Sequence, residues 1–344
     1  MNEDVEVFLD ETPGETRGVI RRSGRYEQLL IQRHDEEPRH RLEARCVGRI
    51  IEINPGLKGA FVDLGTDRPG FLPLPPRLRL HQGEIIAAVV AAEPREAKGV
   101  VLRRLGVGAG EPRLLQPAPD VRALLIRAAP DSAVQTGVAA IDAAMEAEDE
   151  ALAEHFVFQG GALDLSIQRT RALVAVDFDH RPPPGRDGAA ARAAANAEGL
   201  RQTARLLALK ALGGLVVVDL VGDGREGEAT LRQARDAFAG VQSVAFGPVS
   251  RFGLVQLALP WRRRPVVERL CDSKGCPTLQ TTALALVRAM RRNLLTDTTA
   301  PRVAACAAPD LAAIAQPLIR RLGPRAGLIV DADQPAGAVR FEEL

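Results

Sequence analysis

Two short apolar runs, each ending in an aspartate, constrain the fold of this 344-residue chain more than any other feature. Residues 172–176 (Ala-Leu-Val-Ala-Val) lead into Asp177, and residues 213–218 (Gly-Gly-Leu-Val-Val-Val) lead into Asp219. Each run is too short for a helix and rich in β-branched residues, which predicts a buried strand that delivers its carboxylate to a sheet edge. An alanine-rich helix predicted over 188–212 separates them, so the segment predicts a βαβ unit with a parallel strand pair.

Two carboxylates at one sheet edge repel each other. At a separation of about 4 Å the repulsion amounts to about 4 kcal/mol for an effective dielectric constant of about 20. A bound divalent cation or a raised pKa would relieve it. Alternatively, Asp177 and Asp219 each cap the helix that follows its strand. The two runs alone leave metal ligands and helix caps as open alternatives.

Charge and cysteine content limit the class of protein only loosely. The formal net charge is +1, so charge balance does not indicate nucleic acid, although nearly all the basic residues are arginines, which suit phosphate contacts. The four cysteines and the lack of an N-terminal signal pattern predict a reducing cytoplasm rather than a disulfide framework. No transmembrane segment is expected.

The order of predicted elements indicates several α/β and β regions. Residues 5–33 alternate around Gly24 as in a hairpin, and the short strands between residues 44 and 105 are spaced as in a small barrel. A Gly- and Pro-rich linker follows over 106–120. The remaining predictions are strands at 121–127, 254–257, 302–306 and 327–331, and helices at 138–155, 226–239 and 278–295.

The barrel region carries two aromatic side chains in a basic setting. Phe61 and Phe71 lie on two predicted strands, near Arg49, Lys58 and Arg68. Aromatic rings on barrels of this kind stack unpaired bases at about 1–3 kcal/mol per base. Core packing is the alternative for either ring, but two rings beside basic residues favour a nucleic-acid-binding face.

Four motifs, in order, resemble those of the bacterial ribonuclease E/G family, in a short form. The barrel motif over 48–73 resembles the S1-type RNA-binding domain embedded in that family. Residues 174–179 (Val-Ala-Val-Asp-Phe-Asp) resemble its Val-Ser-Ile-Asp-Ile-Asn segment, and 213–219 its Gly-Gly-Leu-Ile-Val-Ile-Asp segment. Residues 250–254 read Ser-Arg-Phe-Gly-Leu, as in the family.

The resemblance implies an α/β multidomain fold. It comprises an S1-like OB-fold barrel, an RNase H-like/DNase I-like α/β catalytic domain and a small C-terminal α/β domain. The implied regions are 1–42 (hairpin segment of the RNase H-like region), 43–105 (S1-like OB fold), 106–137 (abbreviated 5′-sensor and linker), 138–262 (catalytic), 263–280 (zinc-link) and 281–344 (C-terminal domain).

The resemblance also implies the catalytic residues. Asp177 and Asp219 match the two magnesium-binding aspartates of the family. Asp179 stands where the family has an asparagine, and an ionised aspartate can only accept hydrogen bonds, whereas an amide also donates them. We therefore expect a catalytic set of Asp177, Asp179 and Asp219 with an altered metal requirement. The arginine-containing loop 181–186 either clamps the scissile phosphate or is simply solvated.

Single-stranded RNA contacts follow from the same comparison of motifs. Phe61, Phe71 and Lys98 match barrel contacts, Arg127 matches the arginine that senses a 5′-monophosphate, and Arg251 is a candidate backbone contact. The threonine that neighbours the sensing arginine in the family is Ala128 here, and the sensor segment is short. A preference for monophosphorylated 5′ ends is therefore not expected.

The cysteine pair departs from the family pattern. Cys271 and Cys276 are separated by four residues, whereas the family uses Cys-Pro-X-Cys from each of two protomers to share one zinc ion. Two ligands per chain can complete a zinc site only by pairing chains. A zinc-linked homodimer and two free loop thiols both remain open.

Together with these residues, the resemblance implies a cytoplasmic, Mg²⁺-dependent endoribonuclease that cleaves single-stranded RNA to 5′-phosphate and 3′-hydroxyl ends. Its role would be ribosomal RNA processing or RNA decay. The alternative is a catalytically impaired S1-domain protein that binds RNA without cleaving it, suggested by Asp179, the short sensor and the irregular cysteine spacing.

Overall fold

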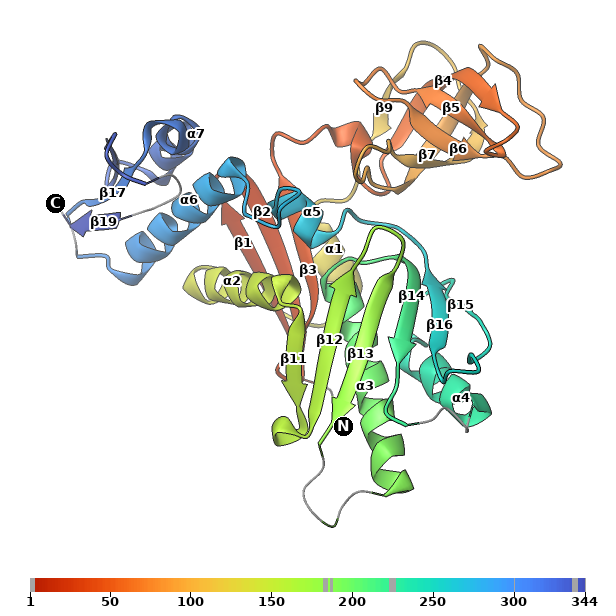
Figure 1. Ribbon diagram of the computed structural model, residues 1–344. Coiled ribbons are helices and arrows are strands. Elements are labelled where there is room, and N and C mark those ends of the chain that lie inside the picture. Colours follow the sequence, from red (N-terminus) through yellow and green to blue (C-terminus); the bar gives the residue numbers. More distant parts are fainter. Residues whose placement is uncertain are drawn as a thin grey trace. The chain divides into compact units, whose positions relative to one another are not determined.

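The computed structural model divides the chain into two compact units (Figure 1). The first unit comprises Met1–Glu148 and Arg263–Leu344, and the second comprises Asp149–Arg262. The structure describes residues 4–181, 185, 188–222, 227–299, 301–335 and 340–343, without the side chains of 159 and 341–343. None of the helices described there is long and apolar enough to cross a membrane.

A four-stranded sheet lies at the start of the first unit. Its strands β1 (Val5–Thr12), β2 (Glu15–Arg22) and β3 (Arg25–Arg33) are antiparallel neighbours, and β10 (Val134–Gln135) pairs in parallel with β1. The predicted hairpin around Gly24 is therefore confirmed, with one further strand before it.

Residues 121–127 form a helix, so the prediction of a strand there is wrong. Helix α1 spans Val121–Ala128, and the Asp120 side chain caps it by accepting a hydrogen bond from the backbone N–H of Ala123. Its buried residues Val121, Leu124 and Leu125 follow helical spacing and pack against the sheet of β1 to β3. The cap and this spacing outweigh the apolar character of the run.

Residues 45–116 form a six-stranded sheet that closes on itself. The order is β5-β6-β8-β7-β4-β9, an additional pairing of β4 with β5 closes the ring through β5, β6, β8, β7 and β4, and β9 pairs with β4 beside it. Alternate residues point inward, and Ile50, Leu64, Leu72, Ile86 and Leu102 are core residues buried almost completely. The strands are β4 (Arg45–Asn54), β5 (Gly59–Asp63), β6 (Gly70–Pro73), β7 (Ile85–Ala92), β8 (Val101–Val107) and β9 (Arg113–Gln116).

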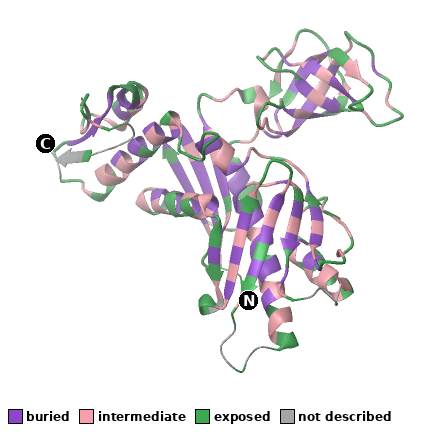
Figure 2. Ribbon diagram, in the orientation of Figure 1, coloured by how far each residue is buried: buried purple, intermediate pink, exposed green. Residues whose placement is uncertain are grey.

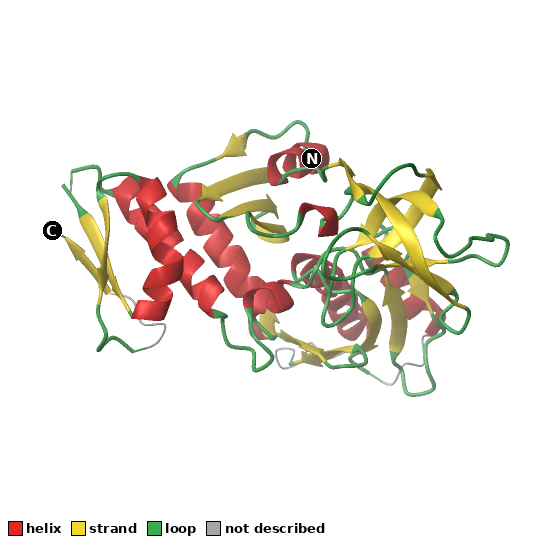
Figure 3. Ribbon diagram, turned by 90° about the horizontal axis from the view of Figure 1, so that it is seen from above, coloured by secondary structure: helices red, strands yellow, loops and turns green. Residues whose placement is uncertain are grey.

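The C-terminal part of the first unit packs two helices beside a three-stranded sheet (Figure 3). Helix α6 (Leu279–Thr296) begins at Thr278, whose side chain accepts from the N–H of Thr281. The other elements are α5 (Val266–Leu270), α7 (Pro309–Ile319), β17 (Val303–Ala307), β18 (Ala326–Val330) and β19 (Arg340–Glu343), with a 3-10 turn at Arg320–Leu322. A further 3-10 turn, Pro38–His40, lies between β3 and β4.

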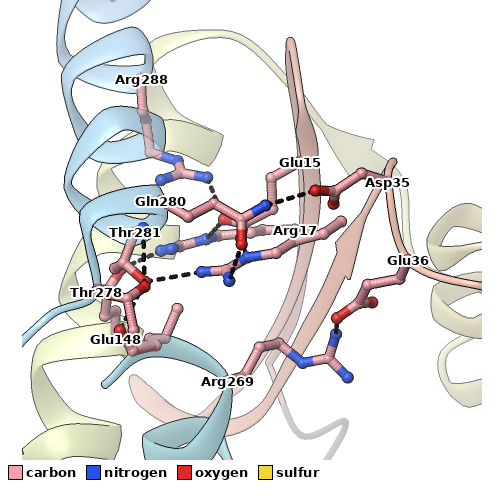
Figure 4. A network of polar contacts seen from close by, with 12 residues as sticks. Glu15, Arg17, Asp35, Glu36, Glu148, Arg269, Thr278, Gln280, Thr281 and Arg288 are labelled. Carbon is pink, nitrogen blue, oxygen red and sulfur yellow. Dashed lines mark hydrogen bonds and ion pairs between the residues drawn. The ribbon is translucent and has the colours of Figure 1, made fainter. Parts of the chain in front are cut away.

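A buried network of charged groups connects α6 to the N-terminal sheet (Figure 4). The Glu15 carboxylate accepts from Arg17 Nε at 2.7 Å, from an Arg288 terminal nitrogen at 2.7 Å and from Arg33 Nε at 3.1 Å. Arg288 Nε also donates to Asp10 at 2.7 Å. Because Glu15, Asp10, Arg17 and Arg288 are almost completely buried, this network satisfies charges that would otherwise be very costly.

The second unit is built on a mixed six-stranded sheet of order β11-β12-β13-β14-β16-β15. Strands β13 (Val174–His180) and β14 (Gly214–Asp219) are parallel, which confirms the predicted pairing, and the other pairings are antiparallel. The remaining elements are β11 (His155–Phe158), a 3-10 turn (Gln159–Gly161), β12 (Leu163–Arg169), α3 (Ala189–Leu209), α4 (Gly227–Ala237), β15 (Ala245–Phe246) and β16 (Val255–Leu259). Helix α2 (Val138–Leu152) begins in the first unit and ends in the second.

Helices α3 and α4 lie against one face of this sheet, behind it in Figure 1. The inner residues of β13 on that face include Phe178, whose ring packs where α3 has Gly199. A Cβ atom at Gly199 would lie 2.4 Å from the ring, so the absence of a side chain lets helix and strand approach closely. Residues that point to the other face are less buried, as the bands along β12, β13 and β14 in Figure 2 show.

Candidate active site

Asp177 and Asp219 occupy matching positions on the two parallel strands. They are direct register partners at the carboxyl ends of β13 and β14. Neighbouring strands lie about 4.8 Å apart, so the two backbones hold the carboxylates side by side. Both side chains are exposed, and neither forms a hydrogen bond or ion pair with another residue that the structure describes. The two Asp-bearing runs of the sequence thus converge at one sheet edge.

Strand alternation explains why both carboxylates reach the open face. Val174 and Val176 of β13, and Val216 and Val218 of β14, are buried on the helix-covered face. Because successive side chains alternate between faces, the next residue of each strand points the other way. The valines thereby fix the orientation of the aspartates.

Helix capping does not account for Asp177. The N-cap of α3 is Gly188, which makes no side-chain capping hydrogen bond. Asp219 likewise makes no hydrogen bond with the described backbone, which for α4 comprises Gly227–Ala237. Between the two interpretations left open by the sequence, the described structure favours a ligand-binding role for the aspartates.

Strand β12 adds polar groups to the same face that sequence reasoning missed. Ser166 is the register partner of Asp177, and Asp164 is the partner of Asp179. His155 of β11 pairs with Ser166, which extends the row to His155, Ser166, Asp177 and Asp219. The alternation Leu163-Asp164-Leu165-Ser166-Ile167 is the sequence signal that predicts this half-buried strand.

Asp179 lies two residues beyond Asp177 on the open face and has a cationic partner. Arg181 Nε and one of its terminal nitrogens donate to the same Asp179 oxygen at 2.9 and 2.6 Å. These hydrogen bonds and the charge of Asp179 raise the pKa of Arg181. The guanidinium of Arg181, which directly follows β13, therefore partly neutralises the charge of Asp179. The rest of the predicted basic loop, residues 182–184 and 186, lies outside the described residues.

Asn196 of α3 fixes the chain that leaves Asp219. Its side-chain amide donates to the Val221 carbonyl at 3.0 Å, and its oxygen accepts from the Val221 N–H at 2.9 Å. This pair of bonds anchors the backbone two residues past the carboxylate. Asn196 is a positioning residue that no motif in the sequence indicated.

The donor set fits a hard divalent cation held by few protein ligands. Among the described residues, no group of three or more His, Cys, Asp or Glu side chains is placed to hold a metal ion. Mg²⁺ is commonly bound through one or two carboxylates with water completing its shell. The adjacent, exposed and unpaired Asp177 and Asp219 match that pattern.

Phe61 and Phe71 face outward from the barrel. They are register partners on β5 and β6, their ring centroids lie 5.6 Å apart at 63°, and both are partly exposed. Neither is among the inward-facing core residues, so core packing does not explain them. A Cβ atom on Gly59 would lie 2.2 Å from the Phe71 ring, so a glycine is needed beneath it.

The remaining predicted RNA contacts lie on three separate segments. Lys98 is exposed in the loop between β7 and β8. Arg127 on α1 donates two hydrogen bonds of 2.7 Å to Glu43, which raise its pKa. Its guanidinium would have to leave Glu43 to clasp a phosphate in the same fork. Arg251 is exposed in the turn before β16.

Cys271 and Cys276 flank a short turn. Cys271 is buried at the end of α5, Cys276 is exposed, and both the Lys274 and Cys276 N–H groups donate to Asp272. Burial, and then the charges of Glu148 and Asp272, raise the pKa of the Cys271 thiol. A metal would have to displace that proton. The turn itself carries two free thiols, one buried and one exposed.

Comparison with known proteins assigns the segment that holds the aspartates. Residues 139–264 match the Ribonuclease E/G family. This segment belongs to the ribonuclease E/G family. In addition, 94 residues are 28% identical to Ribonuclease G of Haemophilus influenzae (strain ATCC 51907 / DSM 11121 / KW20 / Rd), over 27% of this chain and 17% of that protein.

The ribonuclease E/G segment contains the whole open-face site. Asp177, Asp179, Asp219 and Arg251 lie within it, as does Asn196. The barrel, Arg127 and both cysteines of the 271–276 turn lie outside the matched residues. The family match therefore covers the segment that carries these residues.

Proposed function

We propose that this chain is a Mg²⁺-dependent endoribonuclease that cleaves single-stranded RNA. The observation that carries the proposal is the register pairing of Asp177 with Asp219 on an open sheet face, inside a segment of the ribonuclease E/G family. A like-charge pair on adjacent strands opposes folding. Its presence is accounted for if the two carboxylates serve a bound cation.

Asp177 and Asp219 would hold the metal ion, and Asn196 keeps the end of β14 in place for it. When bound there, Mg²⁺ would lower the pKa of a water molecule and stabilise the charge that develops on the scissile phosphate. Asp179 would orient the attacking water or a ligand of the metal ion, and Arg181 offsets its charge. Attack by water on phosphorus with departure of the 3′ oxygen leaves 5′-phosphate and 3′-hydroxyl ends.

The closed barrel is the RNA-binding part of the proposal. We infer that it is an S1-like OB fold and that the mixed sheet belongs to an RNase H-like/DNase I-like catalytic domain. Phe61 and Phe71 stack unpaired bases, and Lys98 contacts the backbone. Arg127 would act as an abbreviated 5′-end sensor only after release from Glu43, so cleavage does not depend on a 5′-monophosphate.

A shared zinc ion and a homodimer belong to the proposal as well. Cys271 and Cys276 of two chains would supply four thiolates. Elemental analysis, with the native mass measured before and after chelation, tests this: a zinc-free monomer contradicts it. A cytoplasmic enzyme of ribosomal RNA processing or RNA decay is the corresponding cellular role.

Cleavage of an A/U-rich single-stranded RNA in Mg²⁺ tests the activity. We expect Asp219→Asn to reduce the cleavage rate by about 10²–10³-fold, as the loss of one group that stabilises transition-state charge does elsewhere. RNA binding should persist, because the barrel is unchanged. Asp310→Asn, at an exposed carboxylate of α7, is the control and should cleave normally.

The same assay separates the enzyme from a catalytically impaired RNA-binding protein. If the unmodified chain and Asp219→Asn bind the RNA equally and both leave it intact, the enzymatic proposal is wrong. Analysis of the product ends adds an independent check, since 5′-hydroxyl ends would exclude attack by water with loss of the 3′ oxygen.

A further inference from the structure

The turn that precedes β16 projects an aromatic ring into solvent. Phe252 is 82% exposed, and no ring contact joins it to another described residue. Burial of a phenylalanine side chain would contribute about 1.5–3 kcal/mol, so this exposure forgoes a substantial gain. The preceding residue, Arg251, is exposed too, so a cationic residue adjoins Phe252 in the chain.

The turn holds this ring in a defined place. The Ser250 hydroxyl accepts from the N–H groups of Phe252 and Leu254 at 3.2 and 3.1 Å. The Ser250 N–H donates to the Leu254 carbonyl at 2.9 Å, and the Gly253 N–H donates to the Ser250 carbonyl at 3.0 Å. Gly253 has φ +82°, a conformation that glycine adopts without strain. Phe252 therefore projects from a closed, hydrogen-bonded turn.

The turn lies at the same sheet edge as the candidate active site. Val255, the first residue of β16, pairs with Val218, so Leu254 comes opposite Asp219. Phe252 comes two residues before Leu254 in the chain, past the edge at which β14 ends. From strand spacing and chain geometry, the Cα atoms of Phe252 and Asp219 are at most about 12 Å apart.

We propose that Phe252 is a base-stacking residue of the candidate active site and that Arg251 holds the adjoining phosphate of the same single-stranded RNA. This inference rests on the proposed function and specifies how the nucleotide near the scissile bond is held. Stacking on an aromatic ring tolerates any base, and a neighbouring arginine adds charge to it.

A single projecting ring fits a nucleobase better than a protein partner. Stable protein interfaces cover about 800 Å² on each partner around a well-packed apolar centre. At this turn the residues next to Phe252 are the exposed Arg251 and a glycine. An unpaired base, by contrast, needs one flat face and a nearby positive charge.

Fluorescence of 2-aminopurine in the RNA tests the proposal. We would place the probe at successive positions around the cleavage site and bind each RNA to Asp219→Asn protein, in which we expect cleavage to be slowed about 10²–10³-fold. One position should show quenching that disappears on adding Phe252→Ala, with binding weakened about 5- to 150-fold, equivalent to about 1–3 kcal/mol. Phe252→Trp should retain the quenching, and Val330→Ala, at an apolar residue 55% exposed on β18, should change neither reading.

An abasic nucleotide at the quenched position sharpens the test. If Phe252 stacks that base, removing the base and removing the ring weaken binding by the same factor, and both together weaken it no further. If Phe252→Ala leaves both the quenching and the RNA affinity unchanged, the proposal is wrong, whether or not the turn binds a protein partner. Since these readings need no cleavage, Phe252-dependent stacking in a chain that never cuts RNA would reject the enzymatic proposal alone.

Discussion

Both units place carboxylates on β-sheets, but they treat them in opposite ways. In the first unit, Asp10 and Glu15 are buried, and each accepts hydrogen bonds from arginines. In the second unit, Asp177 and Asp219 are exposed, adjacent and without a partner among the described residues. The first arrangement holds distant segments of the chain together. The second presents negative charge at a surface and lowers the stability of the fold.

The difference teaches how to separate structural from ligand-binding carboxylates. Glu15 is surrounded by Arg17, Arg33 and Arg288, so its charge is compensated within the fold. Where the fold supplies no basic partner for a pair of carboxylates, the neutralising charge comes from a cation or from a positively charged group of a ligand. Asp179 stands between these cases, because Arg181 offsets its charge at an exposed position.

Removing the central buried carboxylate should have the largest effect on stability. Glu15→Gln leaves three buried arginines short of one negative charge, and breaking a buried pair in this way costs about 3–5 kcal/mol. Urea unfolding of the variant and the unmodified chain at pH 7 measures the difference. Glu6→Gln is the matched control on the same sheet: its partly exposed pair with Arg21 should contribute only about 0.2–1 kcal/mol. Equal losses in both variants would remove the distinction between the two kinds of carboxylate.

Acid should weaken the first unit in a defined pH window. Burial favours the protonated form of Glu15, but the charges of Arg17, Arg288 and Arg33 outweigh it and lower the pKa from 4.5 to about 2. Below pH 4.5 the unfolded chain takes up this proton and the folded chain does not, so stability falls as the pH drops toward 2. The loss amounts to about 3 kcal/mol at about 1.4 kcal/mol per pH unit. Urea titrations of the unmodified chain and Glu15→Gln should converge across this window, and parallel curves would contradict the assignment.

Local sequence patterns predicted the candidate site well where one strand determines the outcome. The runs before Asp177 and Asp219 contain the alternation that turns the carboxylates away from the helices, and the helix between them indicated a parallel pair. The same alternation in residues 163–167 was equally readable and was missed. The strand prediction at 121–127 failed because apolar content was weighed above the capping Asp120.

Partners far apart in the chain could not be predicted. Arg288 reaches Asp10 across most of the sequence, and nothing near either residue specifies the other. The hydrogen bonds between the Asn196 amide and Val221 depend on how α3 packs against the sheet, which it contacts at β12 and β13. Such contacts are set by packing, so only the described fold shows which polar residues stabilise it and which remain available to a ligand.

The smallest expected effect is the sharpest test of the comparison. Without metal, Asp219→Asn removes a like-charge cross-strand pair, so we expect it to stabilise the second unit by about 0.2–1 kcal/mol. Asp177→Asn should give the same gain, and the double variant should gain little more than either, because one repulsion is relieved only once. Adding Mg²⁺ should make the unmodified chain more stable than Asp219→Asn, since binding to the native state stabilises only the chain that retains both carboxylates. Thermal unfolding in EDTA and in Mg²⁺ measures both signs. A destabilised Asp219→Asn protein in EDTA would mean that the aspartates support the fold, like Glu15, instead of serving a bound cation.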